Sequence, residues 1–136
     1  MVKPITRRSF GSFFRMVMAG AFGGFLVAIP ATLIGAKVLA GNSLGGFEDL
    51  VGAIMGMLLG YPLGVVLGIL VYSRVFHYPG SVWLAVPGAL AGMVLILGLA
   101  EPLNLNSNSD VLLGSYFVLT TLLATAGFHL KKAVRA

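Results

Sequence analysis

Two histidines are the residues of this sequence best suited to hold a metal or a cofactor. His77 follows the second of four long apolar segments, and His129 lies near the end of the fourth. Because both segments should end on the same side of a membrane, the two imidazoles could bind a metal or ligate a haem or chlorin axially. The sequence has no cysteine and no acid near either histidine, so it supplies no further ligands. We therefore keep a haem- or pigment-binding subunit only as a second alternative to the function given at the end of this section, and we predict no metal site.

The hydroxyl side chains offer little catalytic chemistry. No GxSxG or HExxH motif is present, and hydroxyls such as Ser115 and Thr121 are unactivated. Tyr61, beside Pro62, is the most polar group in the middle of its segment. Its hydroxyl either donates to a carbonyl that the proline leaves free or lines the path of a neutral solute. We expect no enzyme.

The composition points to a membrane. Hydrophobic residues make up 58% of the chain and charged residues 10%, whereas a soluble domain is typically about 25% charged. Such a chain cannot cover itself with a polar surface, which excludes a soluble globular enzyme and a disordered chain. The lack of cysteine excludes a disulfide-stapled secreted domain.

Four apolar runs are long enough to cross the hydrocarbon core, which takes about 20 helical residues. The links between them are too short to fold separately, so we predict one all-α domain, residues 1–136, built as a bundle of four transmembrane helices. Three prolines lie inside the runs and predict kinks, since neighbouring helices can satisfy the freed carbonyls. The runs are residues 16–38, 50–72, 82–100 and 111–130, and the prolines are Pro30, Pro62 and Pro87.

The charged residues are divided unevenly between the two ends of these runs. Eight of the nine basic residues fall on one side, whereas Lys37 and all four acidic residues fall on the other. Because excess lysine and arginine in short loops marks the cytoplasmic side, we predict a multi-pass protein of the plasma (inner) membrane with both termini cytoplasmic. The eight are Lys3, Arg7, Arg8, Arg15, Arg74, Lys131, Lys132 and Arg135.

The net charge of +5 is therefore interpreted as attraction to anionic lipid headgroups and not to nucleic acid. Residues 5–15 combine arginines with phenylalanines in a basic amphipathic segment, which we expect to lie on the inner leaflet. No ionisable residue lies deep within a predicted span, although proton- or ion-coupled transport usually needs one. The sequence thus argues against coupled transport.

Small residues recur at every fourth position in the first two spans. The second span has five glycines in four overlapping GxxxG units, and these need a packing explanation because glycine disfavours helix formation. Such stripes let backbones approach closely, so the two spans pack on each other, or the glycine face meets another copy or another protein. The predicted packing residues are Gly52, Gly56, Gly60, Gly64 and Gly68 of the second span, Gly20, Gly24, Ala28, Thr32, Ala36 and Ala40 of the first, and Gly88 and Gly92 of the third.

The chain also carries a hint of duplication. Residues 27–35 match residues 84–92 in pattern, and residues 48–53 align more weakly with residues 110–115. The bundle could therefore be two duplicated helical hairpins in parallel repeat, with chance similarity of apolar segments as the rival explanation.

Together these patterns favour a non-catalytic structural or accessory subunit that packs through its small-residue faces against other membrane subunits or against itself. The alternative is a small homo-oligomeric channel or carrier for a neutral solute, with Tyr61 on its path.

Overall fold

The computed structural model describes residues 8–40, 47–78, 80–103 and 107–134. Within these ranges the chain forms four long helices and no strand, which confirms the predicted all-α fold. All four helices are long and apolar enough to cross a membrane, so the chain is a multi-pass membrane protein. The helices are α1 (Arg8–Ala40), α2 (Phe47–Val75), α3 (Val82–Ala100) and α4 (Ser109–Val134).

Each helix contains its predicted apolar run, and α1 extends furthest beyond it. With 33 residues, α1 is about 50 Å long at 1.5 Å per residue. Residues 8–15 of the amphipathic segment continue this helix without a break, and residues 5–7 of that segment lie outside the described residues. The ring of Phe13 packs on His129 of α4, with centroids 5.8 Å apart. The start of α1 is therefore attached to the end of α4.

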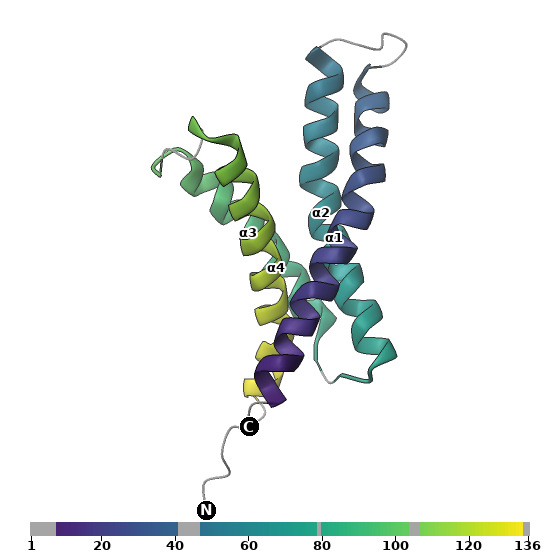
Figure 1. Ribbon diagram of the computed structural model, residues 1–136, viewed down its shortest axis with the longest axis vertical. Coiled ribbons are helices and arrows are strands. Elements are labelled where there is room, and N and C mark those ends of the chain that lie inside the picture. Colours follow the sequence, from purple (N-terminus) through teal and green to yellow (C-terminus); the bar gives the residue numbers. More distant parts are fainter. Residues whose placement is uncertain (1–7, 41–46, 79, 104–106, 135–136) are drawn as a thin grey trace, which may run out of the picture.

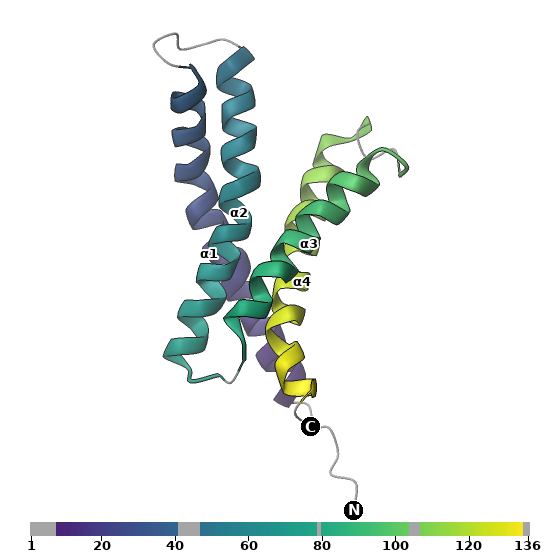
Figure 2. The ribbon, with the colours of Figure 1, turned by 180° about the vertical axis from the view of Figure 1, so that it is seen from behind.

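The helices pair into two antiparallel hairpins, α1 with α2 and α3 with α4, that form a V (Figures 1 and 2). The hairpins meet at the end that holds the start of α1 and the α2–α3 turn, here called the terminal end. They diverge toward the starts of α2 and α4, here called the open end. Buried side chains of α2 and α4, among them Tyr61, Val65, Tyr116 and Phe128, form the core between them.

A tight turn connects the two hairpins at the terminal end. His77 has a φ of 51°, in the left-handed region that residues other than glycine rarely occupy. The N–H of Tyr78 donates to the carbonyl of Ser73 at 3.0 Å, which is the long bond of a Schellman helix end. Ser81 is the N-cap of α3, without a side-chain cap bond, and its N–H donates to the Phe128 carbonyl of α4 at 3.2 Å. The turn is thereby bonded to α4.

The two hairpins share a topology but not a register. Gly35 and Gly92 are equivalent in the proposed repeat, and Gly35 packs on Gly52. The counterpart of Gly52 in α4 is Gly114, yet Gly92 packs on Thr120, and a Cβ on Gly114 would have no neighbour within 4 Å. Equivalent positions of the repeat therefore make different contacts.

Candidate helix interfaces

The five glycines of α2 that recur at every fourth position face α1. A Cβ added to Gly64 would lie 2.8 Å from the Cα atom of Gly24, and one added to Gly68 would lie 3.2 Å from the Cα atom of Gly20. Because no side chain separates them, the two backbones touch along most of the hairpin, which strengthens dispersion contacts. The remaining glycines meet α1 in the pairs Gly52 with Gly35, Gly56 with Ala31, and Gly60 with Ala31.

On α1 the contact surface is a double line of small residues. Gly20, Gly24 and Ala28 of the predicted stripe lie against α2, and so do the Cα atoms of Thr32 and Ala36. The Thr32 hydroxyl donates to the Ala28 carbonyl at 2.7 Å, so it is satisfied within its own helix. Sequence reasoning missed the second line, one position earlier, although it has the same four-residue spacing. Its members are Ala19, Gly23, Val27, Ala31 and Gly35.

The α3–α4 hairpin uses a shorter version of the same packing. A Cβ added to Gly92 would lie 2.6 Å from the Cα atom of Thr120, and one added to Gly88 would lie 3.1 Å from the Cα atom of Ala124. Gly127 of α4 packs in turn on the backbone of α3. Glycines thus stand at the closest contacts of both hairpins.

A tyrosine links the hairpins near the middle of α2. Tyr116 of α4 donates to the Leu58 carbonyl of α2 at 2.8 Å. Pro62 has no N–H to bond this carbonyl, as a regular helix would, so Tyr116 supplies the missing donor. The sequence interpretation gave this role to Tyr61, which lies on the same helix as the free carbonyl; the structure gives it to a tyrosine from the other hairpin.

Tyr61 makes a second contact between the hairpins. Its hydroxyl oxygen lies 2.8 Å from Oγ1 of Thr121 and 3.2 Å from the Phe117 carbonyl oxygen. Its ring packs on Phe117, with centroids 4.6 Å apart, and on Phe25 of α1, with centroids 5.4 Å apart. Because Tyr61 is only 1% exposed, its bonded hydroxyl is part of the contact between the hairpins.

His77 and His129 lie in different environments. His77 is exposed in the turn after α2, whereas His129 is half-buried and packs on the rings of Phe13 and Phe128. Among the residues whose side chains are described, no three histidine, cysteine or acidic residues are grouped so that they could hold a metal ion. Within that part of the chain, neither environment surrounds an imidazole with further ligands of these types.

The chain matches no protein-family model, no curated protein and no solved structure. Its own surfaces are therefore the guide to its function.

The face of α2 that carries Tyr61 changes from buried to exposed toward the open end. Tyr61, Val65 and Ile69 are at most 1% exposed. Ile54 and Phe47 lie seven and fourteen residues before Tyr61, which places them on the same face of the helix, yet they are 45% and 80% exposed. The surface that joins the hairpins thus continues as an uncovered apolar surface.

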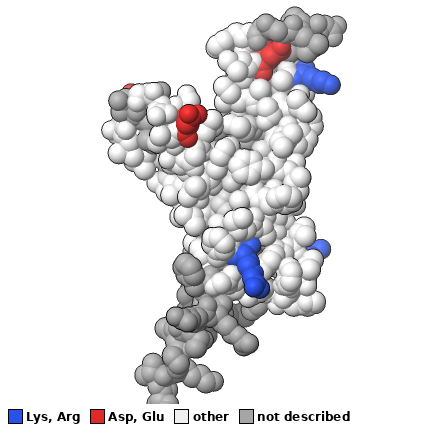
Figure 3. Space-filling view, viewed as in Figure 1, with Lys and Arg blue, Asp and Glu red and all other residues white. Residues whose placement is uncertain are grey.

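α4 shows the same change on its facing side. Phe117 and Thr121 contact Tyr61, and Gly114 precedes them by three and seven residues, which places it on their face. Nothing lies within 4 Å of a Cβ built on Gly114, because the hairpins diverge there (Figure 2). The space-filling view shows a notch at this end (Figure 3). We call it the interhairpin notch and define it by Phe47, Leu50 and Ile54 of α2 and Gly114 of α4.

The described charges lie at the two ends of the molecule (Figure 3). Arg15, near the start of α1, and Arg74, in the last turn of α2, lie at the terminal end. The four acidic side chains and Lys37 lie at the open end, at the starts of α2 and α4 and at the ends of α1 and α3. Among the described side chains, none with a formal charge lies in the middle of a helix.

Proposed function

We propose that this multi-pass membrane protein is a non-catalytic structural or accessory subunit of a larger membrane complex. The observation that supports this role is the interhairpin notch, an apolar surface that continues the contact between the hairpins but has no cover. In this proposal a transmembrane helix of a partner chain packs in the notch and contacts both hairpins.

The glycine faces cannot serve as the main partner surface in this structure. Gly52, Gly56, Gly60, Gly64 and Gly68 are already occupied by α1. A Cβ added to Gly114, in contrast, would meet no atom within 4 Å. A small residue at such an uncovered position lets a second helix approach closely. The notch therefore combines a small-residue wall on α4 with a wall of large apolar side chains on α2.

We further propose that the protein lies in the plasma (inner) membrane with both termini cytoplasmic. The placement of Arg15 and Arg74 at the terminal end supports this orientation. The notch would then open toward the outer leaflet, and the partner helix would have to be apolar at that depth.

The test is the mass and composition of the native particle in mild detergent. We expect further membrane chains to co-purify with the wild-type protein. Ile54→Trp and Gly114→Leu, which fill the notch, should release these chains. A wild-type particle that contains one copy of this chain alone, or copies of this chain only, contradicts the accessory role.

Matched controls are available on faces that point away from the notch. Leu63 is 63% exposed and lies nine residues from Ile54, on the opposite side of α2. A Cβ on Gly98 of α3 would meet nothing within 4 Å, and this residue lies opposite the buried face of its helix. Leu63→Trp and Gly98→Leu should keep the partner chains. Equal loss of partners in the notch and control variants would count against the notch as the binding surface.

A further inference from the structure

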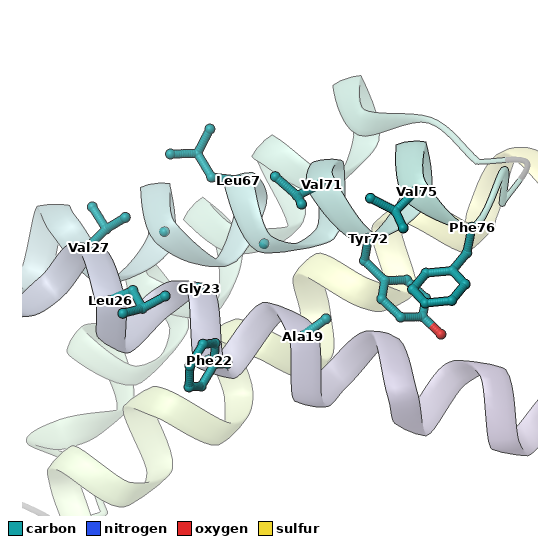
Figure 4. A pocket seen from close by; sticks show the side chains of 12 residues that line it. Ala19, Phe22, Gly23, Leu26, Val27, Leu67, Val71, Tyr72, Val75 and Phe76 are labelled. Atoms are coloured by element: carbon teal, nitrogen blue, oxygen red, sulfur yellow. The ribbon is translucent and has the colours of Figure 1, made fainter.

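An apolar groove runs along the α1–α2 hairpin (Figure 4). Its volume is about 440 Å³, and its floor is the glycine backbone where the two helices touch. Phe22 and Leu26 of α1 form one wall, and Leu67 and Val71 of α2 form the other. Toward the terminal end the groove is lined by the rings of Tyr72 and Phe76, whose centroids lie 4.5 Å apart.

Each wall of this groove leads to an arginine. Arg15 precedes Phe22 and Leu26 of α1 by seven and eleven residues, so it lies on the same face of that helix. Arg74 follows Leu67 of α2 by seven residues and lies on the same side of its helix. Both arginines are exposed.

The two arginines also lie at the same level along the hairpin. Gly64 packs on Gly24, and Gly68 packs on Gly20. A step of four residues toward the end of α2 therefore corresponds to a step of four residues toward the start of α1. Continuing this register along the hairpin axis places Arg15 at the level of Ser73 and Arg74, although the start of α1 and the end of α2 lie apart at this end (Figures 1 and 2). All four acidic side chains of the sequence lie at the opposite end of the helices, so none of them neutralises this pair.

We infer that the groove binds an anionic diacyl phospholipid. One acyl chain lies in the groove between the walls of α1 and α2, and the phosphate lies at the level of Arg15 and Arg74, where either guanidinium can attract it. An apolar channel that ends at two cations matches a molecule with a long apolar chain and one anionic end. A transmembrane helix of a partner would fit the apolar walls but would leave the two arginines at this end unexplained. This inference does not depend on the proposed role of the notch.

Quenching of tryptophan fluorescence by brominated lipids tests this site. Trp83 is the sole tryptophan, so Val71→Trp in a Trp83→Phe background places a single reporter in the groove. The protein is reconstituted into phosphatidylcholine vesicles that contain dibrominated phosphatidylglycerol or, at the same mole fraction, dibrominated phosphatidylcholine. Because each of the two arginines near the headgroup favours an anionic lipid, we expect the anionic lipid to occupy the groove up to about thirtyfold more strongly than the zwitterionic lipid.

Three comparisons separate a specific site from general attraction to a basic surface. Arg15→Gln with Arg74→Gln should abolish the preference for the anionic lipid, whereas Lys37→Gln, at the other end, should leave it. Trp83 of the wild-type protein is 88% exposed at the start of α3 and should show a much weaker preference. Phe22→Trp provides a second groove reporter if Val71→Trp disturbs the fold.

The site is overturned if both lipids quench the groove reporters equally. Preference that survives the double arginine substitution also contradicts it. A groove tryptophan that no lipid quenches shows that a protein segment covers the groove. If soluble glycerol phosphate fully abolishes the quenching by the brominated anionic lipid, the arginines bind the phosphate without the acyl chain, which also contradicts the proposed lipid site.

Discussion

Tyr116 donates a hydrogen bond of 2.8 Å to the carbonyl of Leu58, the acceptor that Pro62 leaves without a backbone partner. The bond joins the two hairpins at a depth where the hydrocarbon offers no water to replace it. The proline and the tyrosine thus act as one unit, because Pro62 exposes an acceptor on α2 and α4 supplies its donor.

Removal of this donor should destabilise the protein measurably. Tyr116→Phe keeps the ring in its buried place but leaves the Leu58 carbonyl unbonded, so we expect the free energy of unfolding to fall by about 1 kcal/mol. Unfolding in mixed micelles by titration with a denaturing detergent gives this value.

The Pro62→Ala background supplies the control for that measurement. The substitution restores a backbone N–H four residues after Leu58, so the carbonyl would regain a helical partner. The same Tyr116→Phe change should therefore cost less in this background than in the wild-type protein. An equal cost in both backgrounds would show that the hydroxyl does not act through the free carbonyl.

Local patterns in the sequence contain the helices and the spacing of the glycines, but not the contacts between the hairpins. Helix number and span positions depend on local apolar runs, and the stripe of Gly52 to Gly68 depends on local spacing. The partner of the Leu58 carbonyl depends on the relative placement of α2 and α4, which no local pattern contains. The same holds for the exposure of Ile54 and Gly114, since the divergence of the hairpins decides which apolar face stays uncovered.

Two glycines provide a matched test of close backbone packing. A Cβ on Gly64 would lie 2.8 Å from the Cα atom of Gly24, whereas one on Gly98 would meet nothing within 4 Å. Gly64→Ala should lower the free energy of unfolding by about 2 kcal/mol, because the backbone of α1 must move. Gly98→Ala should raise it by roughly 0.5–1 kcal/mol through better helix propensity. Similar effects at the two positions would contradict the importance of the α1–α2 contact.

The left-handed conformation of His77 predicts a stabilising substitution. A side chain at φ 51° costs about 1–2 kcal/mol that glycine avoids, so His77→Gly should raise the melting temperature in detergent. His77→Val should lower it, because a branched side chain fits this region worst. If His77→Gly lowers stability instead, the imidazole makes a contact that outweighs the strain.

The orientation of the chain can be tested with cysteines placed at opposite ends. The sequence contains no cysteine, and both Gly11 near the start of α1 and Asn108 just before α4 are exposed. The positive-inside rule predicts that Gly11 faces the cytoplasm, since Arg15 and Arg74 lie at its end of the molecule. A membrane-impermeant maleimide should therefore label Asn108→Cys in intact cells and Gly11→Cys only after permeabilisation. The reverse pattern would place Arg15 and Arg74 at the outer leaflet and contradict the proposed cytoplasmic termini.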